Sequence, residues 1–189
     1  GVSAEASSLA GHQQLGNLTV LYDDNHISIE DDTNVAFSED VAARYEAYGW
    51  HVQKVDWTNG GKEYVEDVQA LYDAFQAAAA VTDKPSFIQL RTIIAWPAPT
   101  KQNTGASHGS ALGAEEIAAT KKLLGFDPEK SFYVADDVLA HTQAARTRGT
   151  ELQKEWQAAF DAWKPKHSDG AALLERMTSR TLPDGWDAE

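Results

Sequence analysis

The sequence predicts an α/β fold, a parallel sheet with flanking helices, followed by a helical C-terminal segment. Three apolar runs rich in β-branched and aromatic residues alternate with two helical patterns in the first half of the chain. Apolar runs of this kind are typical of strands buried on both faces, and a strand–helix series implies crossover connections within one parallel sheet. In such a sheet, ligands bind beyond the carboxyl ends of the strands.

Each element of the first half has a local signal. In chain order, we expect a helix over 3–15, a strand over 17–23, a helix over 39–49, a strand over 50–57, a helix over 64–80 and a strand over 85–96. Gly16 and Asn17 supply a stop signal for the first helix, which we expect to end near Leu15. Ser38, followed by two acidic residues, is predicted to cap the second helix, and Gly49 closes it.

The second half changes character after Trp96. Residues 97–113 are rich in Pro, Gly, Asn, Ser and Thr and have few apolar side chains, which predicts a long loop. Loops of this length are usually functional or disordered. Helical patterns return over 114–124, 135–146, 150–164 and 171–179. The closing stretch TLPDGWDAE has the composition of a linker.

Charge and composition narrow the class of protein. The chain has 29 Asp and Glu against 16 Lys and Arg, a net charge of -13, so we expect neither nucleic acid nor a membrane as a partner. No apolar run approaches the roughly 18 residues of a membrane helix, and no basic and apolar leader opens the chain, which favours a cytoplasmic protein. Without cysteine, a bound metal would be a hard cation held by nitrogen or oxygen ligands. Because the first residue is Gly1 and not an initiator Met, we expect the chain to start inside a larger protein.

The stretch LYDDNHISIEDD, residues 21–32, follows the first predicted strand. Its five carboxylates allow two interpretations, a metal loop or a solvated acidic turn. Asn25 lies two residues before Ile27, and a side-chain oxygen and a backbone carbonyl at that spacing can both turn toward one hard cation. A neutral Asn ligand suits a site where an anion such as a diphosphate brings the negative charge.

His108 is the functional candidate among the six histidines. It lies in the long loop between Gly105 and Gly109, which allow the backbone to approach a ligand closely. The other histidines show no metal-binding helical spacing, so no zinc site is expected. If Asn25 and Ile27 face a metal, the side chain of His26 is expected to point away from it.

Several long segments together resemble one family. These are GVSAEASSLAGHQQLGNLTVLYDDNHISIEDD, FSEDVAARYEAYGWHV, KPSFIQLRTII and SHGSALG, and they are similar to transketolase, a thiamine diphosphate-dependent enzyme, over almost the whole chain. The cofactor signature of that family begins with Gly-Asp-Gly and ends at the asparagine that matches Asn25. The resemblance implies that the Gly-Asp-Gly lies upstream of Gly1 and that its aspartate would complete the metal site.

The resemblance implies roles for five residues. Asn25 would bind the metal through its side chain and Ile27 through its carbonyl, and Ile29 would line the cofactor site. Ile94 would pack on the thiazolium ring, and His108 would contact the diphosphate and reach the substrate side. Asp23 and Asp24 are then expected to shape the loop and not to coordinate.

The same resemblance divides the chain and marks three departures from the family. Residues 1–96 would be the C-terminal part of the diphosphate-binding α/β domain, 97–113 the active-site loop, 114–181 the helical remainder of that domain, and 182–189 the start of a linker to a missing second domain. The departures are Ala95 for the usual Gly, Trp96 for the frequent Tyr or Phe, and Ser-Ala for the common Ala-Pro after Gly109.

The implied function is transfer of a two-carbon ketol unit from a ketose phosphate to an aldose phosphate, in the pentose phosphate pathway. The implied cofactors are thiamine diphosphate and Mg²⁺ (or Ca²⁺), and the implied partners are sugar phosphates, the remainder of the same enzyme and a second subunit in a homodimer. Because the activating glutamate and the phosphate-binding arginines of the family are absent here, we expect this chain alone to be inactive. Two alternatives stay open. One is a related thiamine diphosphate enzyme such as dihydroxyacetone synthase, and the other is a non-enzymatic acidic α/β module that binds a cation or a partner protein.

Overall fold

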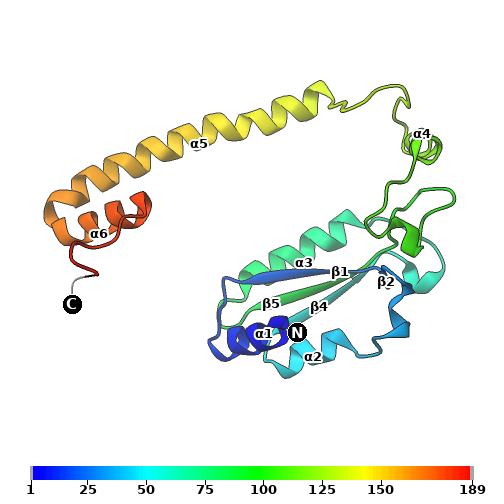
Figure 1. Ribbon diagram of the computed structural model, residues 1–189, viewed down its shortest axis with the longest axis horizontal. Helices are drawn as coiled ribbons and strands as arrows, with labels where there is room; N and C mark the ends of the chain where they lie inside the picture. Colours follow the sequence, from blue (N-terminus) through cyan, green and yellow to red (C-terminus); the bar gives the residue numbers. More distant parts are fainter. Residues whose placement is uncertain (1, 188–189) are drawn as a thin grey trace. The chain divides into compact units, whose positions relative to one another are not determined.

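The computed structural model describes residues 2–187, which divide between two compact units (Figure 1). The first unit ends at Lys130 and contains the sheet, and the second begins at Ser131 and is helical. None of the helices within residues 2–187 combines the length and apolar character needed to cross a bilayer.

A parallel three-stranded sheet forms the centre of the first unit. Its strands, in the spatial order β1-β5-β4, are β1 (Thr19–Asp24), β5 (Ser86–Arg91) and β4 (His51–Asp56). The prediction of a parallel α/β sheet is confirmed. The register aligns all three carboxyl ends, because Asp24 and Asp56 both lie opposite Arg91 of the central strand.

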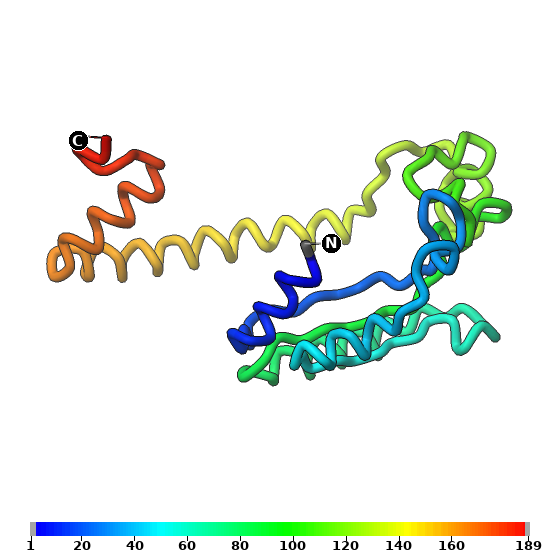
Figure 2. The backbone as a smooth tube through the Cα atoms, turned by 60° about the horizontal axis from the view of Figure 1, so that its bottom comes forward, coloured from blue at the N-terminus to red at the C-terminus, as the bar shows by residue number. Residues whose placement is uncertain are grey.

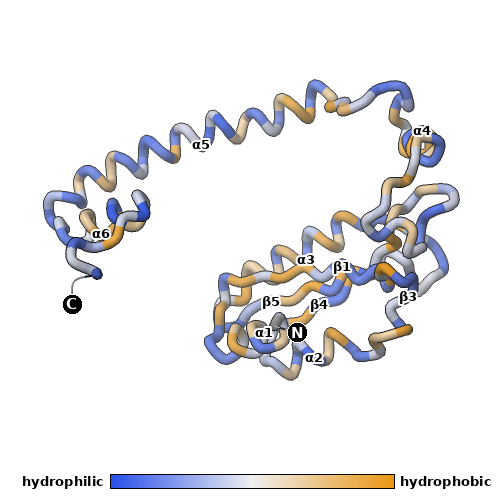
Figure 3. Tube along the Cα trace, viewed as in Figure 1, coloured by the Kyte–Doolittle hydropathy of each residue, from blue (hydrophilic) through white to orange (hydrophobic). Residues whose placement is uncertain are grey.

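Helices cover both faces of this sheet (Figure 1). They are α1 (Val2–His12), α2 (Val41–Ala47) and α3 (Val68–Ala80). Alternation along β5 sends Ile88 toward the cluster that contains α3, and Phe87 toward the cluster that contains α1 and α2. Two small residues of α3, Ala74 and Ala78, are buried against the sheet. Figure 3 shows the hydrophobic residues concentrated along β5 and α3.

Aromatic side chains fill the α1 and α2 side of the core. The Tyr45 ring stacks on Phe87 with centroids 3.8 Å apart and meets Trp50 edge-on at 5.0 Å. The buried indole of Trp50 donates through Nε1 to the Ser7 carbonyl oxygen at 2.8 Å. This hydrogen bond satisfies the polar atom of the indole and ties α1 to the sheet.

Three helix boundaries differ from their predicted positions, and capping side chains set two of them. The first helix ends at His12, before Leu15, and Gln14 beyond it has a left-handed φ of 55°. The cap of α2 is Asp40 and not Ser38, because the Asp40 side chain accepts from the Ala43 N–H at 3.0 Å. The helix predicted over 64–80 begins only at Val68, after a similar cap.

The expectation that the first strand is buried on both faces is wrong. Within residues 2–187, β1 pairs with β5 alone, and its residues alternate between exposed and partly buried until Asp24. Leu21 is 43% exposed. The strand therefore lies at an edge of the described sheet. Some of its apolar side chains, such as Leu21, are left exposed by the rest of this unit.

The second unit has fewer helices than the sequence predicted. A single helix, α5 (Asp136–Trp163), replaces the two expected over 135–146 and 150–164. Gly149 lies within it, and a glycine inside a helix costs about 1 kcal/mol but does not by itself end the helix. After a 3₁₀ turn, η4 (Lys164–Lys166), the chain continues into α6 (Ser168–Ser179).

Candidate functional site

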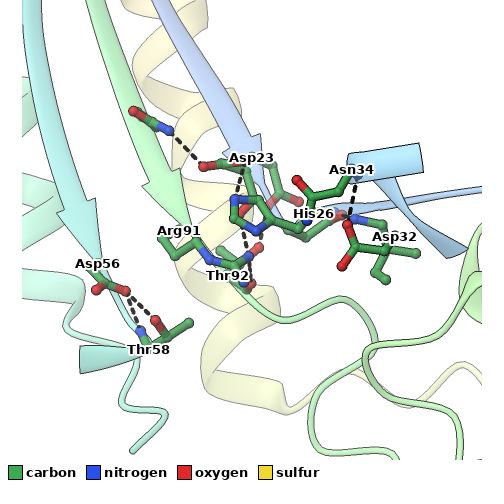
Figure 4. A network of polar contacts seen from close by, with 12 residues as sticks. Asp23, His26, Asp32, Asn34, Asp56, Thr58, Arg91 and Thr92 are labelled. Carbon is green, nitrogen blue, oxygen red and sulfur yellow. Dashed lines mark hydrogen bonds and ion pairs between the residues drawn. The ribbon is translucent and has the colours of Figure 1, made fainter. Parts of the chain in front are cut away.

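Arg91 organises the carboxyl edge of the sheet. Its Nη1 donates to the carbonyl oxygens of Asp24 and Thr92, each at 2.8 Å, and Thr92 donates through its hydroxyl to the carboxylate of Asp23 (Figure 4). The guanidinium thus holds the ends of β1 and β5 together where a ligand of a parallel sheet would bind.

The buried Asp24 carboxylate holds the turn after β1 to the central strand. Its Oδ2 accepts from Gln89 Nε2 at 2.7 Å, and its Oδ1 lies 3.3 Å from His26 Nε2. Burial raises the pKa of the Tyr22 hydroxyl, and the negative charge of Asp24 raises it further. Asp23 and Asp24 therefore have partners within the protein, which agrees with their expected role in shaping the loop.

Asn25 and Ile27 lie in one tight turn beyond β1. The Asn25 Oδ1 accepts from the Ile27 N–H at 2.9 Å, and His26 between them has a φ of 60°. The His26 side chain turns back toward Asp24 (Figure 4). Asn25 can offer a neutral oxygen to a hard cation from this turn.

A hairpin follows this turn and presents an apolar residue to solvent. Strands β2 (Ile27–Ser28) and β3 (Asp31–Asp32) pair antiparallel, and Ile29 between them is 74% exposed. A short 3₁₀ turn, η1 (Thr33–Val35), then begins at the cap supplied by Asp32.

Ile94 lies in the turn that follows β5, and the long loop forms a hydrogen bond with it. The Ile94 carbonyl accepts from the Asn103 N–H at 3.0 Å. Ala95, the residue that stands where the family usually has Gly, adopts a left-handed φ of 58°. The departure from the family thus places a side chain on a backbone conformation that favours glycine.

Lys101 is the internal anchor of the loop that carries His108. Its Nζ donates to the Leu112 carbonyl at 2.7 Å, and its own carbonyl accepts from the hydroxyls of Thr104 and Ser107. His108 is exposed and follows the 3₁₀ turn η3 (Gly105–Ser107). The predicted long loop is therefore ordered by its own hydrogen bonds.

Glu116 fastens the start of that loop to α4 (Ala114–Leu123). Hydrogen bonds from the Thr100 N–H and hydroxyl and from the Lys101 N–H hold the pKa of the Glu116 carboxyl below its ordinary value. The ionised carboxylate is thus the form that holds the loop.

The hairpin and the His108 loop meet at Asp31, whose Oδ1 accepts from the N–H of Gly105. Figure 2 shows the two segments side by side. The structure therefore brings Ile27, Ile29 and the His108 loop into one region, with Asn25 in the adjoining turn and Ile94 bonded to the loop. Within the described range, no group of three or more His, Cys, Asp or Glu side chains is placed to hold a metal ion.

One family model matches almost the whole chain. Residues 1–183 match the model of the family described as transketolase, thiamine diphosphate binding domain. The chain belongs to the transketolase family. The resemblance seen in the sequence is confirmed, and the match is to a domain that binds thiamine diphosphate.

Individual transketolases agree with this family assignment. The chain is 56% identical over 189 residues to transketolase of Mycobacterium tuberculosis, which covers 100% of this chain and 26% of that protein. The chloroplastic transketolase of Zea mays is 44% identical over 186 residues, 98% of this chain and 26% of its own length. The chain therefore spans about a quarter of the length of these relatives.

Solved transketolases share the fold. The enzyme of Leishmania mexicana superposes with a TM-score of 0.87 at 35% identity, covering 100% of this chain and 27% of that one. The Pichia stipitis enzyme in complex with sedoheptulose-7-phosphate gives a TM-score of 0.84 at 41% identity, covering 98% of this chain and 26% of that one. These matches support the α/β assignment independently of the strand pairing.

Sequence reasoning missed four residues that shape this transketolase-family site: Asp31, Arg91, Lys101 and Glu116. Arg91 lies in a predicted strand and Lys101 in a predicted loop. No sequence pattern around a single basic side chain in such a segment marks it as part of a site. Glu116 is an acidic residue in the first turn of a helix, where the helix dipole already explains its presence. The sequence therefore gives no separate sign that it accepts hydrogen bonds from the loop. Asp31 was visible only as one of five acids in a loop.

Proposed function

We propose that this chain supplies the diphosphate- and metal-binding part of a transketolase that transfers two-carbon ketol units from a ketose phosphate to an aldose phosphate. The observation that carries the proposal is the Asn25–Ile27 turn at the carboxyl end of β1, inside a domain of the matching family. Thiamine diphosphate and Mg²⁺, or Ca²⁺, are the proposed cofactors.

Different residues of the chain are proposed to bind the cation and the apolar part of the cofactor. The Asn25 side chain and the Ile27 carbonyl provide two neutral oxygens to the cation, and the remaining ligands come from the diphosphate, water and the rest of the enzyme. Ile29 and Ile94 are proposed to cover the apolar part of the cofactor, which accounts for the exposure of Ile29. When bound, thiamine diphosphate supplies a nucleophilic carbon and an electron sink for carbon–carbon cleavage.

His108 is the proposed catalytic residue. Its exposed imidazole stands in a loop that is bonded at both ends, so it can donate an N–H to a diphosphate oxygen or to the oxygen that gains charge on the substrate. The two roles need a fixed imidazole position, because misplacement by about 1 Å is enough to cost orders of magnitude in rate.

The proposed partners follow from what this chain carries. The sequence has a net charge of -13, which does not favour the binding of sugar phosphates, so their phosphate groups are proposed to bind cations in the remainder of the enzyme. A homodimer is proposed as the working form, as the family resemblance implies. The transketolase relatives favour this activity over that of dihydroxyacetone synthase.

A titration tests the metal assignment. In the full-length enzyme, Asn25→Ala is expected to weaken thiamine diphosphate binding in the presence of Mg²⁺ by at least about tenfold, measured by isothermal titration calorimetry. Asn34→Ala, in the 3₁₀ turn after the hairpin, is the matched control and should bind like the wild type. Equal affinity for Asn25→Ala and wild type would defeat the assignment, and Mg²⁺ binding without any cofactor binding would favour the cation-binding module.

A further inference from the structure

The contact between Asp31 and Gly105 joins two segments that lie 74 residues apart in the sequence. On one side is the hairpin that follows the Asn25–Ile27 turn, and on the other is the 3₁₀ turn that leads into His108. The contact is a charge-assisted hydrogen bond, because the acceptor is a carboxylate oxygen and the donor is a main-chain N–H.

Two hydrogen bonds lead from Asp31 to the backbone of His108. The Asp31 Oδ1 accepts from the Gly105 N–H, and the Gly105 carbonyl accepts from the His108 N–H at 2.9 Å. Both N–H groups belong to a single 3₁₀ turn, so a shift of Gly105 moves the backbone of His108 with it. The position of the histidine is therefore fixed from the hairpin side as well as from Lys101.

The glycine at position 105 is explained by this contact and not by its backbone angle. A Cβ there would lie 2.7 Å from Asp31 Oδ1 and 2.8 Å from the Asp31 main-chain nitrogen. Because one of the clashing atoms is backbone, a rotamer change would not relieve the overlap. Only a residue without a side chain lets the loop come this close to the hairpin.

The backbone of Asp31 is also held in an uncommon conformation, with a φ of 67°. Asp and Asn are among the few residues with a side chain that tolerate this region. The hairpin needs a residue that accepts the left-handed conformation, and the loop contact needs an acceptor at the same position. Asp meets both requirements, and Gly would meet only the first.

From this geometry we propose that Asp31 is a positioning residue, which holds the His108 loop against the metal-loop hairpin through Gly105. The inference rests on the proposed function, because the value of holding His108 depends on its place beside the cofactor. Asp31 is exposed and makes no proposed contact with cofactor or substrate.

Two substitutions at Asp31 separate the hydrogen bond from the backbone angle. Asp31→Gly keeps the left-handed conformation and removes the acceptor, and Asp31→Asn keeps both the conformation and the Oδ1 acceptor. Neither variant threatens folding, because Gly and Asn both tolerate the observed φ. Asp32→Gly removes the same charge one residue away, where the carboxylate caps the 3₁₀ turn η1 and does not contact Gly105.

The measurements use the full-length enzyme in its cofactor-free and its Mg²⁺ and thiamine diphosphate forms. Asp31→Gly should raise hydrogen exchange at the Gly105 and His108 amides by about tenfold in both forms, as expected for one lost hydrogen bond to a charged group. It should lower kcat by about tenfold and leave the affinity for thiamine diphosphate within about twofold. Asp31→Asn and Asp32→Gly should stay close to the wild type in both readouts.

The proposal is overturned if Asp31→Gly leaves either the exchange of these amides or kcat unchanged. It is equally overturned if Asp31→Asn is as impaired as Asp31→Gly, since a positioning hydrogen bond is restored by a matching acceptor. Failure of the proposed function has a separate signature, an Asn25→Ala enzyme that binds thiamine diphosphate normally. The exchange measured without cofactor does not depend on that result.

Discussion

The carboxylate of Glu116 accepts two hydrogen bonds from Thr100, one from its N–H at 2.7 Å and one from its hydroxyl at 2.9 Å. A third comes from the Lys101 N–H at 3.0 Å. Because Glu116 lies in the first turn of α4 and Thr100 lies near the start of the long loop, this side chain closes the loop onto the helix that follows it. The loop that carries His108 is thereby fixed at its origin.

Removal of this anchor should loosen the loop. We expect Glu116→Ala to lower the hydrogen-exchange protection of the Thr100 and Lys101 amides in the full-length enzyme by about tenfold at pH 7, since both lose their acceptor. Glu115→Ala, at the neighbouring exposed position, is the matched control. Unchanged protection in Glu116→Ala would show that the carboxylate is not what orders these amides.

The same anchor should depend on pH. The Thr100 N–H is the leading cause that lowers the pKa of Glu116 in the folded protein. A lowered pKa means that the contribution is complete above the ordinary value of about 4.3 and is lost as the pH falls through the lower, folded value. Protection factors of Thr100 in wild type and Glu116→Ala should therefore converge below about pH 4, and a constant difference down to pH 3 would contradict this.

Replacing Ala95 with glycine, the residue that the family usually has, should stabilise the segment after β5. Its φ of 58° is disfavoured for a residue with a Cβ, and Gly would remove a cost of about 1–2 kcal/mol. Gly also adds freedom to the unfolded chain, which offsets about 0.4–1 kcal/mol of the gain. We expect Ala95→Gly to raise the opening free energy of the segment after β5 by roughly 0.5–1 kcal/mol, measured by hydrogen exchange.

A control for Ala95→Gly is Ala98→Gly, at a buried position in the same segment whose φ is not in the left-handed region. There the added chain freedom and the lost side-chain contacts should both destabilise. If the two substitutions have the same sign, strain at Ala95 is not the dominant effect.

Asp24 should be needed for the stability of the strand pair. Gln89 Nε2 donates to Asp24 Oδ2 at 2.7 Å, and the buried Gln89 Oε1 has no hydrogen-bond partner in the structure. Asp24→Ala leaves both ends of the Gln89 amide unpaired, and the expected cost is about 1–3 kcal/mol of opening free energy for β1 and β5. Asp24→Asn keeps an acceptor and should cost less, and equal costs for the two variants would argue against the Gln89 bond as the cause.

The sheet could be predicted from the sequence because its signals are local. The apolar runs of β4 and β5 and the helical pattern of α3 each report on their own segment, and a βαβαβ order then leaves few arrangements. The start of α2 was missed because several polar residues compete for the cap. At 38–40 the sequence offers Ser, Glu and Asp, and only the backbone selects Asp40.

The site divides in the same way. The turn with Asn25 and Ile27 could be placed because a strand precedes it, and the family resemblance named the two residues. The long-range contacts could not be predicted. Asp31 and Gly105 are 74 residues apart, and no sequence pattern indicates that they are in contact. Ala95 is intermediate, since the resemblance identified the departure from Gly and only the observed φ explains what it costs.

Asp56 ends β4 and closes the turn after it, opposite Arg91 (Figure 4). Its Oδ1 accepts from the Thr58 N–H at 2.7 Å and from the Thr58 hydroxyl at 2.6 Å, and its Oδ2 accepts from the Gly60 N–H at 2.8 Å. Desolvation by the surrounding turn acts to raise the pKa of this exposed carboxyl, but the hydrogen bonds from Thr58 and Gly60 outweigh it and the pKa lies below its ordinary value. The ionised carboxylate is therefore the form that stabilises the turn.

Asp56→Ala should weaken the turn in a pH-dependent way. Since Asp56 is exposed, solvent screening limits the expected loss to about 1 kcal/mol of opening free energy at the Thr58 and Gly60 amides at pH 7. The lowered pKa places the contribution above about pH 4, so wild type and variant should converge as the pH falls below that value. Asp83→Ala, which removes a carboxylate that lies 4.0 Å from Lys84, is the control and should show no loss at these amides. A loss in Asp56→Ala that stays the same from pH 7 to pH 3 would mean that the side chain acts through packing and not through its charge.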